Sequence, residues 1–348
     1  MVSSAVSQAW PAFALVAGLL AIGALAERDG VYAWAAARLA GPAVGRPVLA
    51  TATGLLLVSV VTAFLNLDTA VAFCTPVLVL TAREAGFDER PALYGTVVMA
   101  NGASLLLPGA NLTTLIVLER NDTAPGSVAA ELLPVGLAAA AATAVAVLVT
   151  HRAALRRPPV AAIAARAAPE LGSTGRLTLA LALMCAAIVI LVDEPALAVL
   201  AIGLGAALAR GALRLALRTI SPVSLLALLT LAVGAGIVGR AWHAPSAVVG
   251  QAAPIAAAAW SAGAAVTINN LPASLLLTGR PPANPIAMLI GLGLGANLAV
   301  TGSLSVLLWW RAALTVGARP SALAYSRHGA PAALLAISAA LGIAALVE

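Results

Sequence analysis

Long apolar runs recur along the chain, and they constrain its fold more than any other feature. Several of them cover about 20 residues, the length that a helix needs to cross the hydrocarbon core of a bilayer. Charged residues make up only 9% of the chain, and the mean hydropathy is +1.03, whereas a soluble domain carries about 25% charged residues. We therefore predict an all-α polytopic membrane protein rather than a barrel of short alternating strands.

The apolar runs predict two kinds of membrane segment. Two long stretches, 47–82 and 246–279, are each interrupted in the middle by polar residues. We interpret each as a re-entrant helical hairpin, and we expect the two polar tips, Asn66-Leu67-Asp68-Thr69 and Asn269-Asn270-Leu271-Pro272, to meet inside the membrane. The remaining runs are predicted as spans at 9–26, 92–118, 128–150, 177–192, 195–210, 221–239, 284–310 and 330–347.

The basic residues, all 19 of which are arginines, predict the orientation of the chain. Short cytoplasmic loops of membrane proteins carry an excess of basic residues. When the segment 151–176 is placed in the cytoplasm, 16 of the 19 arginines fall on that side, and only Arg120, Arg240 and Arg280 fall outside. Both termini are then expected outside, in a multi-pass protein of the cell's inner (plasma) membrane.

The chain also resembles itself. Residues 12–114 and 221–303 each run as a helix, a hairpin with a polar tip and an interrupted helix. With the arginine orientation these units begin on opposite sides, so we predict two inverted repeats with broken transmembrane helices. The predicted division is 1–150 for the first repeat, shortened at its start, 151–176 for the cytoplasmic linker and 177–348 for the second. Secondary transporters are typically built in this way.

Polar residues at the tips and at the helix interruptions are the candidate binding residues. A helix breaks at membrane depth only where protein or water satisfies the freed backbone groups, and its exposed ends offer amides to anions and carbonyls to cations. Asn and Ser can also simply join helices, but their matched positions in the two units favour binding. We predict substrate or ion contacts from Asn66, Asp68, Thr69, Asn101, Asn111, Thr113, Asn269, Asn270, Asn297 and Thr301.

Asp68 is the only carboxylate between Val48 and Leu80. A carboxylate at membrane centre costs about 3 kcal/mol on insertion scales, and such residues commonly mark ion pathways. Because no Arg or His is predicted at its depth, burial should favour the protonated form, and we predict a proton-coupling role. The alternative is a helix cap for the returning hairpin helix. His151, His243 and His328 are predicted near loops and are expected to be solvated.

Other functions are disfavoured by what the sequence lacks. Without lysine it has neither a Walker-type phosphate loop nor a Schiff-base lysine. The arginines are scattered without an aromatic-studded basic face, so nucleic acid is not an expected partner. The two cysteines have no metal-ligand spacing, and an intramembrane aspartyl protease would need a second acid facing Asp68. We expect neither an enzyme nor a cofactor, apart from a coupling ion, H⁺ or Na⁺.

At these motifs the chain resembles the arsenite/antimonite permease family, within the ion-transporter superfamily that includes citrate and dicarboxylate carriers and sodium/proton antiporters. The resemblance implies a secondary carrier that exports the uncharged trihydroxide of arsenic or antimony against a proton flux. Its expected partners are the bilayer and a small inorganic or organic solute, with a cytosolic ATPase subunit or a second copy of the chain as further candidates. The resemblance lies in FLNLDTAVAFCTPVLVLTAREAG (64–86), ANGASLLLPGANLTTLIVL (100–118), INNLPASLLL (268–277) and GLGANLAVTGSLSVLLWWR (293–311).

The resemblance carries roles onto these positions and leaves an alternative open. Asp68 matches the acid of the first tip, and the first break, second tip and second break are matched by Asn111, by Asn269 with Asn270, and by Asn297 with Thr301. Two features depart from the pattern. The spans 177–192 and 195–210 have no equivalents in the first repeat, and Gly295-Ala296-Asn297 stands where some permeases carry an acid or a base. A sodium-coupled di- or tricarboxylate carrier of the same architecture is the alternative.

Overall fold

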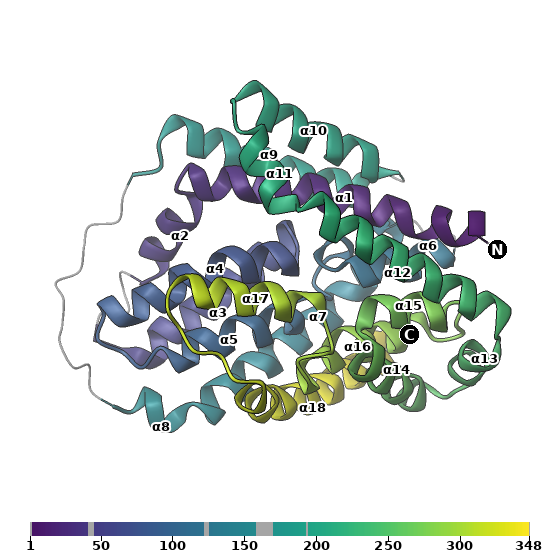
Figure 1. The fold of residues 1–348 in the computed structure, drawn as a ribbon. Helices are drawn as coiled ribbons and strands as arrows, with labels where there is room; N and C mark the ends of the chain where they lie inside the picture. The colour runs from purple at the N-terminus through teal and green to yellow at the C-terminus, as the bar shows by residue number, and fades with distance from the viewer. Residues whose placement is uncertain (1, 41–44, 122–124, 158–169, 193, 348) are drawn as a thin grey trace.

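In the computed structural model the chain is an assembly of helices (Figure 1). The structure describes residues 2–40, 45–121, 125–157, 170–192 and 194–347, and no strand occurs among them. The predicted all-α polytopic fold is confirmed. Among these residues six helical segments are long and apolar enough to cross a membrane: Val2–Arg28, Pro47–Phe64, Val128–Thr150, Ser173–Leu191, Leu213–Ala241 and Ala322–Val347.

Two units share one order of elements. The first unit contains α1 (Val2–Arg28), α2 (Val31–Ala40), the hairpin α3 (Pro47–Phe64) and α4 (Leu67–Glu84), the broken helix α5 (Arg90–Gly102), η2 (Pro108–Ala110) and α6 (Leu112–Arg120), and α7 (Pro125–Thr150). The second contains α12 (Pro222–Ala241), α13 (Ala244–Gly250), the hairpin α14 (Pro254–Ile268) and α15 (Asn270–Leu277), the broken helix α16 (Pro285–Gly295), η3 (Ala296–Leu298) and α17 (Leu304–Thr315), and α18 (Ala322–Val347). Between them lie α8 (Arg152–Leu155), α9 (Ser173–Leu191), α10 (Pro195–Ala209) and α11 (Leu213–Ile220).

The two hairpins turn in the same way. Asn66 and Asn269 have φ values of 151° and 75° with ψ values of 171° and 144°, a combination that residues with a side chain rarely adopt. Each of the two also caps the helix that follows, because its side-chain oxygen accepts a hydrogen bond from a backbone amide of the first turn. Asparagine therefore serves at both tips as the turn residue and as the helix cap.

The two units interlock rather than stand apart. In each unit the returning hairpin helix packs on the second half of the other unit's broken helix: α4 packs against α17, and α15 packs against α6. The last helices of the units, α7 and α18, pack extensively on each other, and so do the first ones, α1 and α12. This exchange of partners brings the two hairpins and the two broken helices into one body (Figure 1).

The helices α9 and α10 have no counterpart in the first unit, as the sequence indicated. Helix α10 runs along α1 with the backbones in contact, since a Cβ on Gly203 would overlap the carbonyl oxygen of Gly18. At one end of this pair Asp29 forms an ion pair with Arg210 at 2.8 Å and accepts a hydrogen bond from Thr178 at 2.5 Å. The extra hairpin is thus fixed to the first unit. The short helices α2 and α11 were not predicted.

Arg28, Arg120 and Arg240 each donate a hydrogen bond to a carbonyl of a distant segment. Arg28 donates a hydrogen bond to the Arg210 carbonyl at 3.2 Å, and both were predicted to be cytoplasmic. Of the three predicted outer arginines, Arg120 donates to the Thr278 carbonyl at 3.0 Å and Arg240 to the Ser4 carbonyl at 3.1 Å. The Gln8 side chain is bonded to the side chains of both Arg240 and Thr278, so these two contacts lie in one region. The sidedness itself stays a prediction, and residues 158–169 of the predicted linker lie outside the described residues.

Candidate functional site

Four segments define the candidate site. Tip 1 comprises residues 66–69 and tip 2 residues 269–272, where the two hairpins turn. Break 1 comprises residues 103–111, between α5 and α6, and break 2 residues 296–303, between α16 and α17. All the predicted binding residues lie in these segments or within two residues of them.

Tip 2 is tied directly to break 2. The Asn269 side-chain amide donates to the Thr301 carbonyl at 3.2 Å, and the backbone amide of Asn270 donates to the Gly302 carbonyl at 2.9 Å. The Thr301 hydroxyl in turn donates to the Val266 carbonyl on α14 at 2.6 Å. The structure therefore brings together the predicted site residues of the second unit's hairpin and broken helix.

The two breaks are joined to each other by a pair of asparagines. The amide of Asn101 donates to the side-chain oxygen of Asn297 at 2.9 Å, and the amide of Asn297 donates to the Val98 carbonyl at 2.9 Å. The Tyr325 hydroxyl reaches break 2 from α18 and donates to the Ala296 carbonyl at 3.0 Å. The sequence did not indicate the role of Tyr325, although its position in an apolar run, in a chain with only three tyrosines, was a usable signal.

Each of the four helices that begin at a tip or a break has a side-chain cap. The caps are Asn66 on α4, Asn111 on α6, Asn269 on α15 and Ser303 on α17, with oxygen-to-amide distances of 2.7, 3.0, 3.2 and 3.2 Å. The amide that Asn111 binds belongs to Thr113. One cap leaves other first-turn amides and the partial positive charge of the helix unsatisfied. The site thus combines four helix N-termini, an arrangement suited to anionic or hydroxyl-rich solutes.

Asp68 lies in the first turn of α4 and is 8% exposed. The alternative that it caps α4 is not what the structure shows, because Asn66 makes the capping bond to Thr69. In the part of the chain that the structure describes, the Asp68 carboxylate has neither a hydrogen-bond partner nor an ion-pair partner. A proton-coupling role for this buried acid stays a prediction.

Tip 1 and its neighbours contain buried polar atoms that have no hydrogen-bond partner among the described residues. They are the Asn66 amide nitrogen and the hydroxyls of Thr62, Thr69 and Tyr32. Thr69 and Tyr32 approach the same point of α1, since a Cβ on Gly23 would lie 2.6 Å from the Thr69 methyl and 3.4 Å from the Tyr32 hydroxyl. A buried polar group left unsatisfied costs about 1–3 kcal/mol. These atoms retain the capacity to form hydrogen bonds, which makes them candidate contacts for a solute or an ion.

Break 1 shows the same property. The Ser104 and Thr114 hydroxyls and the Asn101 side-chain oxygen are buried and have no hydrogen-bond partner. Helix α16 passes close to them, because a Cβ on Gly293 would lie 2.9 Å from the Ser104 hydroxyl and 3.8 Å from the Asn111 amide. Glycine at this position leaves space beside the polar atoms.

Contacts between these segments differ along the chain. Helix α3, which leads into tip 1, packs on η2 of break 1, the end of α5 is joined to break 2 by Asn101 and Asn297, and break 2 is bonded to tip 2. No hydrogen bond connects tip 1 with tip 2 in the described residues. The expectation that the two tips meet inside the membrane stays a prediction.

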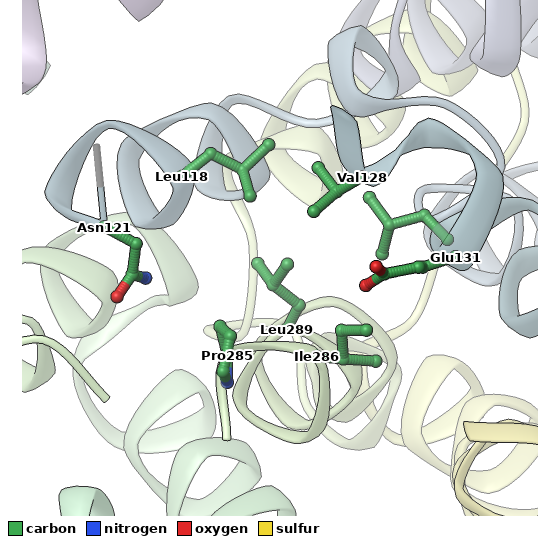
Figure 2. Close-up of a pocket in the computed structure, with 8 residues that line it drawn as sticks. Leu118, Asn121, Val128, Glu131, Pro285, Ile286 and Leu289 are labelled. Carbon is green, nitrogen blue, oxygen red and sulfur yellow. The ribbon is translucent and has the colours of Figure 1, made fainter. Parts of the chain in front are cut away.

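A cavity of about 150 Å³ lies elsewhere, between α6, α7 and α16. Figure 2 shows the Glu131 carboxylate and the Asn121 side chain at this cavity, among Leu118, Val128 and Leu289. Its lining is otherwise apolar and includes none of the tip or break residues. We place the candidate site at the tips and breaks, where the unpartnered polar atoms and helix ends gather.

Comparisons with known proteins agree with this architecture. The model of the citrate transporter family, CitMHS, matches residues 2–216. The chain belongs to the citrate transporter family. It is thus a membrane transporter, and its place in the ion-transporter superfamily is confirmed. Specificity for arsenite stays a prediction.

The fold of a solved transporter is also similar. The crystal structure of the Alcanivorax borkumensis YdaH transporter, described as having an unusual topology, superposes with a TM-score of 0.52 at 15% sequence identity. The match covers 99% of this chain and 86% of that one, so almost the whole helical arrangement is shared. No curated protein matches the sequence.

Proposed function

We propose that this family member is a secondary carrier of a small di- or tricarboxylate of the citrate class, coupled to protons through Asp68. One observation carries the proposal: four capped helix N-termini begin at the tips and breaks, and one of them, that of α4, carries a buried acid in its first turn. Helix N-termini bind anions through their free amides and their dipoles. Carriers built from broken helices aim such ends at the charged groups of their substrates.

Asp68 supplies a physical reason for coupling. An ionised Asp68 repels a carboxylate bound near tip 1, whereas a protonated Asp68 does not and can donate a hydrogen bond to it. Substrate and proton would then bind together and cross together. A sodium ion beside the ionised acid would remove the repulsion equally well, so the coupling ion is decided by experiment.

The test is uptake of radiolabelled citrate into proteoliposomes, driven by a pH gradient or by a sodium gradient. We expect accumulation against the citrate gradient when protons flow inward with it. Asp68→Asn imitates the protonated acid, so it should abolish gradient-driven accumulation and retain exchange of internal for external citrate. Accumulation that persists in Asp68→Asn would refute the role of the acid. Glu131→Gln, at the cavity away from the site, is the matched control and should behave as the native protein.

Export of arsenite or antimonite is the second candidate. It is favoured by the neutral character of the polar groups, because in the described residues the tips and breaks are hydrogen-bonded by amides and hydroxyls and by no arginine or histidine side chain. An uncharged trihydroxide needs no fixed cation. Everted vesicles that take up arsenite in response to a pH gradient and ignore citrate would establish this function, and the reverse result would exclude it.

The distribution of the arginines predicts the orientation of the chain in the membrane. We propose a plasma-membrane protein with residues 151–176 in the cytoplasm. A cytosolic ATPase subunit and a second copy of the chain are the candidate partners. A cysteine in place of Ser173, at the start of α9, should be labelled by an impermeant thiol reagent in everted vesicles and not in intact cells. Labelling in intact cells would reverse the orientation.

A further inference from the structure

Two histidines from different units stack on each other away from the tips and breaks. The rings of His151, just after α7, and His328, on α18, have centroids 4.2 Å apart and planes inclined by 20°. His151 is only 4% exposed, so the expectation that it is solvated was wrong. The two rings form a titratable pair where α7 and α18 pack on each other, away from the candidate site.

The hydrogen bonds of His151 leave it ready to accept a proton. Its Nδ1 lies 3.0 Å from the Val147 carbonyl, which can only accept, and 3.3 Å from the Thr150 hydroxyl, so we assign the hydrogen to Nδ1. Nε2 then has a lone pair, and this atom is buried without a hydrogen-bond partner among the described residues. Burial lowers the pKa of His151, and the ring is held in its neutral form at neutral pH.

The charges around the pair favour that neutral form. Arg90 at the start of α5, Arg327 beside His328 and Arg152 at the start of α8 are positive. The one acid whose charge reaches His151 is Asp88, and it is already paired with Arg90 at 3.1 Å. Protonation of either ring places a positive charge among these arginines and against the other ring. Protonation of one ring therefore weakens the stacking of the two rings.

An aromatic series leads from the pair to break 2. Tyr94 on α5 lies 5.1 Å from the His328 ring and 5.6 Å from Trp309, and Trp309 lies 5.7 Å from Tyr325. The Tyr325 hydroxyl is the one that binds the Ala296 carbonyl. Tyr325 and His328 are also one helical turn apart on α18 and so share a face. These contacts form a continuous packed route from His328 to break 2.

We propose that His151 and His328 form a second proton-binding site, separate from Asp68, whose protonation unstacks α18 from α7 and loosens break 2. With the arginine orientation this site faces the cytoplasm. Acidification of that side would weaken the Tyr325 bond and expose the segment between η3 and α17. The site would regulate access to the carrier, whichever solute it moves.

The test places a reporter in break 2 and reads its accessibility rather than transport. Ala299→Cys, at a half-buried position, is labelled with a maleimide in purified protein from about pH 7.5 to about pH 4, because burial lowers the pKa of His151 below the ordinary value for histidine. The native Cys74 and Cys185 are buried and give a low background. The same reporter is measured with His328→Phe, which keeps a flat ring in the stack and removes the titration.

The ratio of the two labelling rates decides the proposal. The intrinsic pH dependence of the thiol and the titration of Asp68 are common to both proteins and cancel. We expect the ratio of native to His328→Phe labelling to rise severalfold as the pH falls, and His151→Phe to give the same result if His328→Phe does not fold. A ratio that stays constant would overturn the proposal. Because no solute is used, failure here is distinct from failure of the proposed transport activity.

Discussion

Tip 1 and tip 2 are built alike and exposed differently. Both turn at an asparagine with positive φ that caps the returning helix. At tip 1 Asn66 and Thr69 are at most 1% exposed and Asp68 is 8% exposed. At tip 2 Asn269 is half-buried, and its partner Thr301 is exposed. The two units therefore share one backbone arrangement but differ at their tips. Tip 1 is buried and carries an acid, whereas tip 2, with its partner Thr301, is partly exposed and carries only amides and a hydroxyl.

The difference gives two similarly built segments unequal surroundings. Beside tip 2 the Asn269 side chain and Thr301 reach the surface of the molecule, although Asn270 is buried. At tip 1 the acid is buried, where its charge matters most to a bound anion. Under the proposed function, transport would need a second state in which these exposures are exchanged.

The largest expected effect comes from displacing α18 from break 2. A Cβ on Gly329 would overlap the Asn297 carbonyl oxygen, whereas a Cβ on Gly342 of the same helix meets nothing within 4 Å. We expect Gly329→Ala to push α18 away from break 2 and abolish citrate uptake. Gly342→Ala should leave uptake unchanged and raise the thermal midpoint slightly, since alanine favours helix by up to about 1 kcal/mol. Equal activity of the two variants would contradict the described contact.

Because the two tips differ in exposure, an acid added at tip 2 is not expected to replace the acid of tip 1 in citrate accumulation. Asp68→Asn should abolish proton-driven accumulation. Leu271→Asp, which adds an acid at tip 2 within the first turn of α15, should not restore it in the Asp68→Asn background. Accumulation of citrate under a pH gradient measures both. Restoration would show that the two tips are interchangeable.

A smaller effect is expected on stability at tip 1. Asn66 has φ 151° and ψ 171°, a region that is almost restricted to glycine and costs a residue with a side chain about 1–3 kcal/mol. Asn66→Ala keeps that strain and loses the cap, worth about 1 kcal/mol. Asn66→Gly loses the cap and relieves the strain. The thermal midpoint should therefore be lower for Asn66→Ala than for Asn66→Gly, and the opposite order would contradict the described turn.

The mildest test leaves function intact and measures exposure alone. Thr301→Cys at break 2 should react readily with a water-soluble thiol reagent, because Thr301 is exposed, and Thr69→Cys at tip 1 should react slowly, because Thr69 is 0% exposed. The rates are compared under identical conditions by mass spectrometry. Similar rates would mean that tip 1 is as open as tip 2.

Much of the architecture could be predicted because the bilayer sets the length of an apolar helix. The hairpins and interrupted helices followed from Asn66, Asp68, Asn111, Asn269 and Asn297, since polar residues in an apolar run have few structural explanations. Helices α2 and α11 were missed because they are too short to show as spans. Contacts such as Asn101 with Asn297, or His151 with His328, join residues far apart in the sequence and leave no local pattern. The solute was not predictable because amides and hydroxyls at the tips and breaks suit both a carboxylate and a neutral trihydroxide.

The close crossing of α1 and α10 has a consequence for how this molecule could move. Where Gly18 meets Gly203 no side chain separates the backbones, so one helix cannot slide or rotate past the other without first parting from it. Any rigid-body displacement of α1 must then take α10 with it, and the ion pair of Asp29 with Arg210 holds the far end of the same pair. Helices α9 and α10 would then move together with the first unit, and any relative motion between parts of the protein would occur at other helix contacts.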